Sequence, residues 1–253
     1  MALLPSLLNN SDSWISIDKP TISRLDKLQN TMFRILFAVP NSTPTPILRF
    51  DLGCLSMNER IDQKKLNFLR HIQSLESESL ANEIYNLQKS FNFPGLVNEC
   101  RKMIKEYGLP DIIDDKLTFS KNQWKTLVKE AIQKKSRTNI FEEFRKYSKL
   151  SKRDLEKEKF ELKTYIHKMK LRDARTYFII RSSMIPAKMN MKGNPKFAAE
   201  LWRCDDCQSM DSQSHILWCP AYAPLREGKN LDDDDDLIKY YQTVMKIREE
   251  AMK

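Results

Sequence analysis

The residues best suited to chemistry in this chain are three cysteines and a histidine that lie close together near the C-terminus. Cys204 and Cys207 form a Cys-x-x-Cys pair, His215 follows after seven residues, and Cys219 after three more. Structural zinc sites take four Cys or His ligands at tetrahedral corners. A tight turn can supply two thiolates, and a His-x-x-x-Cys pair supplies two ligands from one helical face. The pattern therefore predicts a closed, structural zinc site at Cys204, Cys207, His215 and Cys219.

Two other interpretations of this motif are open. A redox Cys-x-x-Cys pair requires a thioredoxin-like βαβ context, which the Lys-, Met- and Leu-rich flanks do not resemble. Unrelated cysteines beside a core histidine would require this spacing to arise by chance. We expect the flanking apolar residues to form a small core around the metal: Leu201, Trp202, Ile216, Leu217 and Trp218. The alternative for the two tryptophans is stacking on unpaired bases.

The positive charge of the chain is concentrated just before this motif. The 253 residues include 43 Lys plus Arg and 34 Asp plus Glu, which gives a formal net charge of +9. Residues 121–200 contain 22 basic and 9 acidic residues, so this segment contributes +13 and the rest of the chain −4. A basic excess of this size predicts an anionic partner, most simply RNA or DNA.

Within that segment, three lysines follow one face of a predicted helix. Lys121, Lys125 and Lys129 recur at i, i+4 and i+8, where like charges repel each other unless a phosphate backbone relieves the repulsion. A solvated helix face is the alternative explanation. The full set of predicted phosphate contacts is Lys121, Lys125, Lys129, Arg175, Arg181, Lys188 and Lys192. Such contacts give affinity without base readout.

Helical patterns must position these residues. The chain has only five glycines, and its Lys-, Glu-, Leu- and Met-rich stretches favour helices. Apolar residues recur at spacings of three and four, and capping residues or Gly and Pro mark the ends. We expect helices over residues 18–38, from 56, around 80–87, from 94 to 107, over 120–132, near 141–147, over 150–170, over 174–181 and over 237–252. The predicted fold is mainly α, with a helical body followed by a small zinc module and a C-terminal helix.

This reading divides the chain into four segments. Residues 1–118 form a helical body, 119–199 a basic helical connector and 200–225 the zinc module. Residues 226–253 form an acidic segment, Asp232 to Asp236, and the last helix. Five like charges in a row favour a solvated segment, and we expect the last one or two of them to cap that helix.

The remaining cysteines and the N-terminal residues indicate in which cellular compartment the protein is expected. Cys54 and Cys100 lie among apolar residues, as buried free thiols do, and this usage favours a reducing compartment over a disulfide framework. The N-terminal apolar run has no basic residues before it and is broken by Pro5, so we expect neither a signal peptide nor a membrane span. We predict an intracellular protein that is not secreted, and a nuclear location would suit a nucleic-acid partner.

Several stretches together resemble the region that follows the polymerase palm in non-LTR retrotransposon reverse transcriptases. They include Leu25-Asp-Lys-Leu-Gln-Asn-Thr-Met-Phe-Arg-Ile-Leu36, Leu52-Gly-Cys-Leu55 and Ala174-Arg-x-x-Phe178-x-x-Arg181. The zinc ligands and Cys219-Pro-Ala-Tyr222 then resemble the zinc-binding segment at the end of such proteins. The resemblance covers the chain from about Leu3 to the C-terminus, and the ligand set is its most specific part.

The resemblance implies a helical thumb and connector that hold template and primer, followed by a zinc knuckle that engages nucleic acid. It also implies that the palm is missing, because the carboxylates that hold the catalytic metals lie on a Phe- or Tyr-x-Asp-Asp hairpin in this family. Ile112-Ile113-Asp114-Asp115 has a similar pattern, but it lies in a Pro-bounded stretch that we expect to be a loop over 111–118. No catalytic residues are predicted.

The sequence thus predicts a non-catalytic nucleic-acid-binding fragment of a reverse transcriptase-like protein, with structural zinc, and a truncated reading frame would explain such a chain. The alternative is a structural or interaction module that docks on a missing polymerase palm or on another protein. That alternative predicts exposed apolar surface around Leu3 to Leu36 and weak nucleic-acid affinity. RNA-directed DNA polymerase or endonuclease activity in the chain itself ranks last.

Overall fold

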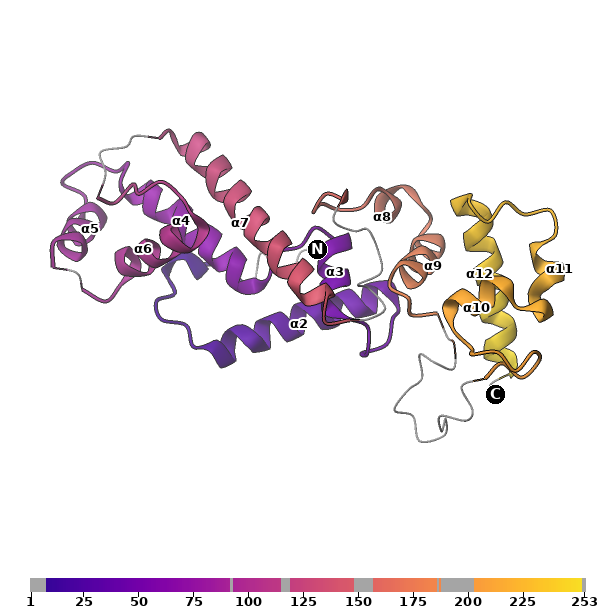
Figure 1. Cartoon of the computed structure of the whole chain (residues 1–253). Coiled ribbons are helices and arrows are strands. Elements are labelled where there is room, and N and C mark those ends of the chain that lie inside the picture. The colour runs from indigo at the N-terminus through magenta and orange to yellow at the C-terminus, as the bar shows by residue number, and fades with distance from the viewer. Residues whose placement is uncertain are drawn as a thin grey trace.

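Helices account for the regular secondary structure of this protein. In the computed structural model, residues 8–91, 93–114, 119–147, 157–185, 187 and 203–251 are described. These residues form eleven α-helices, two short 3-10 helices and no strand, which confirms the prediction of a mainly α fold. The molecule is elongated, with α2 to α9 at one end and α10 to α12 at the other (Figure 1).

The larger part of the molecule is built around a main hydrophobic core, with a smaller cluster of Leu8, Met57 and Ile61 beside it. Its α-helices are α2 (Lys19–Phe37), α3 (Thr45–Asp51), α4 (Met57–Ile72), α5 (Leu80–Phe91), α6 (Leu96–Tyr107), α7 (Lys121–Phe144), α8 (Thr164–Lys168) and α9 (Leu171–Arg181). The core runs from Phe33 on α2 to Phe178 on α9. Trp124 of α7 is fully buried, and its indole N–H donates to the carbonyl of Leu66 at 3.0 Å. Residues on both sides of the predicted boundary at 118 therefore share this core.

Local capping signals fix where several helices begin and end. Ser56 and Ser120 each accept a hydrogen bond from the backbone three residues on, and Glu59 and Gln123 complete capping boxes. The α6 helix ends at Gly108, whose φ of 62° suits glycine. These positions agree with the boundaries predicted from the sequence.

The α7 helix is longer than predicted. It continues without a break to Phe144, so the short helix expected near 141–147 is its last part. The reason is a row of buried residues four positions apart: Trp124, Val128, Ile132, Ser136, Ile140 and Phe144. This row keeps one face of the helix against α3 and α4 along its whole length.

The helix expected over 150–170 is mostly absent from the described residues of that stretch. Residues 157–163 are not α-helical, and 148–156 lie outside the described part of the chain. Lys163 donates its backbone N–H to the carbonyl of Asp51 at 2.9 Å. Gly53, with a φ of +58°, lies so close to Leu162 that a Cβ would be 2.6 Å from that residue's backbone nitrogen. Tertiary pairing with the end of α3 therefore overrides local helical propensity here.

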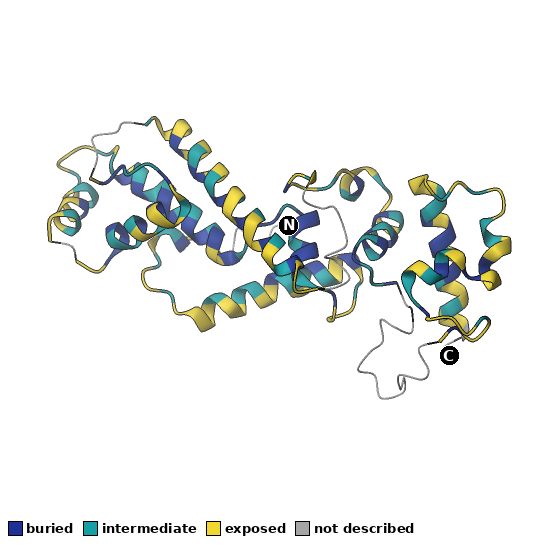
Figure 2. Ribbon diagram, viewed as in Figure 1, coloured by how far each residue is buried: buried dark blue, intermediate teal, exposed yellow. Residues whose placement is uncertain are grey.

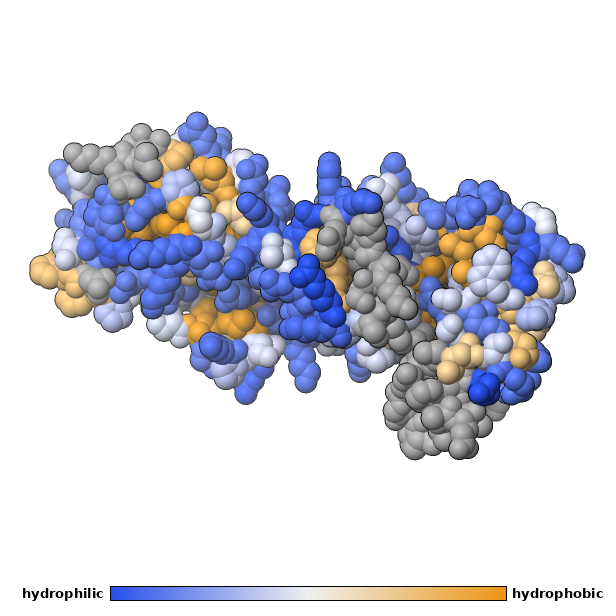
Figure 3. All heavy atoms as spheres, in the orientation of Figure 1, coloured by the Kyte–Doolittle hydropathy of each residue, from blue (hydrophilic) through white to orange (hydrophobic). Residues whose placement is uncertain are grey.

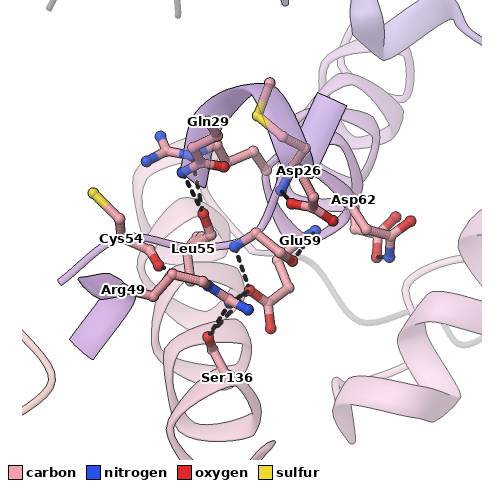
Figure 4. A network of polar contacts seen from close by, with 12 residues as sticks. Asp26, Gln29, Arg49, Cys54, Leu55, Glu59, Asp62 and Ser136 are labelled. Atoms are coloured by element: carbon pink, nitrogen blue, oxygen red, sulfur yellow. Dashed lines mark hydrogen bonds and ion pairs between the residues drawn. The ribbon is translucent and has the colours of Figure 1, made fainter. Parts of the chain in front are cut away.

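A buried polar network joins α3, α4 and α7 (Figure 4). Arg49 donates to Glu59 at 2.7 Å and to Ser136 at 3.2 Å, and the Ser136 hydroxyl donates to the same Glu59 oxygen at 3.1 Å. On α2, Gln29 donates to the carbonyl of Leu55 at 3.1 Å. The Asp26 carboxylate, also on α2, accepts from the backbone N–H of Met57 at 2.8 Å. The network fixes the crossing of the helices where α7 meets the body.

A second buried acid, Asp62 on α4, makes stability depend on pH. Its carboxylate accepts from the Tyr107 hydroxyl at 2.7 Å and from the Asn58 amide at 3.0 Å. Burial raises the pKa of Asp62 from 3.8 to about 6. Because the folded-state pKa is the higher one, the contribution of this group to stability is complete below pH 4 and is lost as pH rises through 6.

We expect Asp62→Asn to flatten this fall in stability between pH 4 and pH 7. The raised pKa of Asp62 lowers the free energy of unfolding at neutral pH by at most about 3 kcal/mol, since one pKa unit corresponds to about 1.4 kcal/mol. The variant should not show this loss. Urea unfolding at a series of pH values measures it, with the exposed Glu78→Gln as the matched control. A wild-type pH profile in Asp62→Asn would contradict the assignment.

The smaller part of the molecule has its own core. Its helices are α10 (Gln213–Trp218), η5 (Pro220–Tyr222), α11 (Ala223–Arg226) and α12 (Asp234–Ala251). Ile216, Cys204 and Cys219 pack there with Tyr240, Tyr241 and Val244 of α12. Figure 2 shows the buried residues gathered along one face of α12. The C-terminal helix therefore belongs to the same core as the predicted zinc ligands, although the sequence analysis placed it in a separate segment.

Candidate metal centre and basic surface

The four predicted ligands come together at one point. The ligand atoms of Cys204, Cys207, His215 and Cys219 all lie within 4.8 Å of one another. Cys219 Sγ is 3.7 Å from Cys204 Sγ and 4.0 Å from Cys207 Sγ. His215 Nε2 is 3.4 Å from Cys207 Sγ. Cys204 and Cys219 are buried and the other two half-buried, so the group could hold one metal ion.

A tight turn presents the first two ligands. The Cys204 N–H donates to the carbonyl of Ser209 at 2.8 Å, and the Gln208 N–H donates back to the carbonyl of Cys204 at 3.0 Å. Gln208 adopts a left-handed φ of 61°, which reverses the chain after Cys207. The Ser209 backbone N–H beside Cys207 lowers the pKa of that thiol.

The short α10 helix presents the other two ligands. Ser212 caps it by accepting from the His215 N–H at 3.1 Å. The Cys219 N–H donates to the carbonyl of His215 at 2.8 Å, so the two ligands lie one turn apart on the same face. Burial raises the pKa of the Cys219 thiol to about 11. A metal that binds here displaces that proton, because cysteine coordinates metals as the thiolate.

Side chains from α12 hold α10 in place. The Tyr240 hydroxyl donates to the carbonyl of Ile216 at 2.6 Å, and the Tyr241 hydroxyl to that of Gln213 at 3.3 Å. Arg248 forms an ion pair with Asp211, which is fully buried just before α10. None of these residues was predicted to support the metal centre. The apolar residues on one face of α12 indicate that this helix packs against something, but they do not show that it packs against α10.

The apolar flanks of the centre differ from the prediction in one residue. Ile216 is fully buried and Leu217 packs against the core, whereas Trp218 is 76% exposed. Ile216 and Trp218 are two positions apart, which places them on opposite faces of the helix. Leu201 and Trp202 lie outside the described residues. The expectation that Trp218 belongs to the core is therefore wrong.

The three lysines of α7 form an exposed row. Trp124 and Val128 occupy the buried face, and Lys121, Lys125 and Lys129 are all exposed beside it. Lys121 Nζ lies 3.4 Å from His71 Nδ1. Within the described part of the chain, no acidic group neutralises these lysines. The row is therefore free to face an anionic partner.

Arg181 has a different role from the one predicted. Its guanidinium binds Asp51 through two hydrogen bonds of 2.9 and 3.0 Å and reaches Glu158 at 2.9 Å. Asp51 is fully buried and also accepts from the Tyr165 hydroxyl at 2.7 Å. These carboxylates raise the pKa of Arg181 against the opposing effect of burial. Because two carboxylates already neutralise its charge, we exclude Arg181 from the phosphate contacts.

The other predicted contacts divide into two groups. Arg175 is half-buried and donates from Nε to the carbonyl of Leu36 at 2.9 Å. Lys188 and Lys192 lie outside the described residues. The structure adds three exposed basic residues that the sequence analysis did not select: Lys168, Lys170 and Arg172, around the junction of α8 and α9. Their close spacing was the sequence signal that could have identified them.

The metal module itself is acidic. Residues 203–251 contain six basic and eleven acidic residues, a net charge of −5. Asp205 and Asp206 are exposed in the turn between the first two ligands. Asp233, rather than the last one or two aspartates of the run as predicted, caps α12 by accepting from the N–H groups of Asp235 and Asp236 at 3.0 and 3.1 Å. The α7 lysines therefore offer the more favourable electrostatic surface for phosphate.

The polymerase-like pattern covers residues 112–115, of which residues 112–114 lie in a turn and residue 115 is outside the described part of the chain. Asp111 accepts from the N–H groups of Ile113 and Asp114 at 2.8 and 3.1 Å. Asp114 pairs with Arg101 at 3.0 Å, and that pairing lowers the pKa of Asp114. This agrees with the predicted loop, whose last residues lie outside the described part of the chain.

Comparisons of the chain with protein-family models, with curated proteins and with solved structures gave no match. Among the described helices, none has an apolar stretch long enough to cross a membrane.

Proposed function

We propose that Cys204, Cys207, His215 and Cys219 hold a structural zinc ion. Zinc bonds of about 2.3 Å to sulfur and about 2.05 Å to nitrogen place tetrahedral neighbours about 3.8 Å apart for two sulfurs and about 3.6 Å for sulfur and nitrogen. Three of the six separations between ligand atoms, 3.7, 4.0 and 3.4 Å, lie close to these values, and all four ligand atoms lie within 4.8 Å of one another. Four protein ligands leave no open position, which supports a structural rather than a catalytic role.

We further propose that the protein binds RNA or DNA through its phosphate backbone. The observation that carries this proposal is the exposed, unneutralised row of Lys121, Lys125 and Lys129 on α7. Like charges at this spacing destabilise an isolated helix, and a phosphate backbone removes that cost. The exposed Lys168, Lys170 and Arg172 add to the same basic excess.

The resemblance to non-LTR retrotransposon reverse transcriptases supports a parent class for this activity. In that class, helices after the palm and a terminal zinc knuckle hold nucleic acid. Within the described residues, the Cys-Cys-His-Cys group is the one cluster able to hold a metal ion. We therefore propose a binding role for this chain rather than a polymerase or nuclease activity of its own.

Salt dependence tests the nucleic-acid proposal. We expect replacement of Lys121, Lys125 and Lys129 by Gln to weaken binding and to reduce the slope of log K against log salt concentration by about 2 to 3. Each lost phosphate contact lowers that slope by roughly 0.7 for single strands and 0.9 for duplex DNA. Fluorescence anisotropy with labelled single-stranded RNA, single-stranded DNA and duplex DNA of one length measures both quantities.

The matched control replaces three exposed lysines elsewhere, Lys102, Lys105 and Lys246, by Gln. It changes the net charge equally, so it separates the α7 surface from a general electrostatic effect. Equal loss of affinity in the two triple variants would contradict the assignment of the α7 row. Wild-type protein that shows no salt-sensitive binding would contradict the proposal itself.

A second function is favoured by the apolar surface of α2. Leu28, Ile35 and Leu36 are exposed on this helix, as expected for a module that docks on another polypeptide. Zinc-loaded protein with no salt-sensitive binding would favour this function over the first. We then expect Ile35→Ser to weaken capture of the partner protein without lowering the zinc content.

A further inference from the structure

The α5 helix carries an exposed apolar stripe with the spacing of a coiled-coil seam. Leu80, Ile84, Leu87 and Phe91 are separated by four, three and four residues, and each is between 45% and 71% exposed. This spacing is that of alternating d and a positions, which place apolar side chains against a second helix. Singly scattered apolar residues need no explanation, but a contiguous stripe marks an interaction surface.

The stripe cannot turn inward, because the opposite face of α5 is fixed to the body. Tyr85 is buried there, and its hydroxyl accepts from the Gln73 amide at 2.9 Å. Lys89 donates to the carbonyl of Ile113. Beside the stripe lies an apolar hollow of about 210 Å³, lined in part by Ile84, Ile72 and Leu96. The hollow provides room for an apolar side chain of an incoming helix.

The α5 helix lies at one extremity of the elongated molecule (Figure 1). Figure 3 shows apolar side chains reaching the surface at this same end. The position favours a partner that meets the protein at its tip.

We propose that this partner is a second copy of the chain, with the two α5 helices antiparallel. The four–three–four spacing reads the same in both directions, so Leu80 meets Phe91 of the second copy and Ile84 meets Leu87. The exposed residues that flank the stripe are Glu83 and Ser90, of which only Glu83 is charged. A surface selected by a charged partner would carry complementary charges, whereas this one presents nothing that repels its own copy.

The antiparallel arrangement also suits the electrostatics. It separates the two Glu83 side chains along the pair and aligns the two helix dipoles in opposite directions. Twelve residues of helix span about 18 Å, so the contact is smaller than the roughly 1,200–2,000 Å² of stable interfaces. We therefore expect weak, concentration-dependent association.

Such association would present two lysine rows to one nucleic acid. Linked binding surfaces can gain affinity without any new contact to the ligand. This consequence rests on the proposed function, whereas the self-association itself does not. The two are distinguished by measuring association in the absence of nucleic acid.

Sedimentation equilibrium of the full chain over a wide range of concentrations tests the proposal. We expect the average mass of the wild type to rise toward twice that of one chain. Ile84→Glu and Leu87→Lys, measured separately, should each remain at the mass of a single chain. The control Asn86→Glu, exposed on α5 outside the stripe, should associate like the wild type.

A mixture of the two charged variants tests the antiparallel register. In an antiparallel pair, Glu at position 84 of one copy meets Lys at position 87 of the other, and the remaining 84–87 contact stays apolar. We expect the mixture to recover association, which a misfolded variant could not do. Wild type that stays at the single-chain mass at every concentration would overturn the proposal and leave the stripe to a different protein. Equal dissociation by Asn86→Glu would overturn it as well.

Discussion

Removal of the proposed zinc ion is expected to unfold the C-terminal module while the larger core stays folded. The core of the module is built on Cys204 and Cys219 themselves, packed with Ile216 and Tyr240. Structural zinc in short peptides contributes roughly 10–16 kcal/mol to folding at neutral pH, which is comparable with the roughly 5–15 kcal/mol that holds an entire domain together. Without the metal, the four ligands would leave polar groups close together inside this core, two of them on buried residues.

Cys219→Ser is the single substitution that tests this expectation best, because this residue is fully buried and joins α10 to the rest of the module. We expect the zinc content to fall from one ion per chain to near zero. Amide exchange should become fast in residues 203–251 and remain slow in α4 and α7. Hydrogen exchange with mass spectrometry and metal analysis of the same sample measure both effects.

The matched control is Cys54→Ser, which removes a buried thiol from the larger core. It should cost stability there and leave one zinc per chain with a protected module. If Cys219→Ser retained wild-type exchange in the module, the metal would not be what holds it together. If both variants lost zinc, the assignment of the ligands would be wrong.

The metal centre was accessible to sequence reasoning because its signals are local. Cys204 and Cys207 lie in one tight turn, and His215 and Cys219 lie one helical turn apart. The spacing alone therefore brings the two members of each pair together. The same holds for the helix starts at Ser56 and Ser120, where the cap and its partner are three residues apart. Such signals act before any tertiary contact forms.

The contribution of α12 to the module was not accessible in this way. Tyr240 bonds to a carbonyl 24 residues earlier, and Arg248 pairs with an acid 37 residues earlier. An amphipathic pattern shows that a helix buries one face, but not which surface receives it. The boundary placed at 225 therefore separated two elements that share one core.

Arg181 illustrates the same limit for charged residues. A basic residue in a basic segment is compatible with a phosphate contact or with an internal ion pair. The deciding partner, Asp51, is 130 residues away in the sequence. Only the tertiary fold reveals that a fully buried carboxylate lies opposite this guanidinium.

Breaking that ion pair is the second large effect that we expect. Arg181→Leu removes the guanidinium but leaves Asp51 fully buried, with the Tyr165 hydroxyl as its remaining side-chain donor. Removing one partner of a buried pair typically costs about 3–5 kcal/mol, because the other charge is left uncompensated. Glu158 would lose one of its two basic partners, since Lys163 still pairs with it at 2.8 Å. Urea unfolding of the zinc-loaded protein measures the loss.

A double-mutant cycle separates the destabilisation caused by an unpaired buried carboxylate from the interaction energy between Asp51 and Arg181. We expect Asp51→Asn with Arg181→Leu to be less destabilising than Arg181→Leu alone, because the double variant buries no charge. The stability of Arg181→Lys should lie between that of the wild type and that of Arg181→Leu. An ammonium keeps the charge but cannot bind Asp51 through two parallel bonds. Additive effects of the two single changes would contradict a direct ion pair. Since this arginine faces inward, Arg181→Lys should also leave the salt dependence of nucleic-acid binding unchanged, in contrast to the lysine replacements on α7.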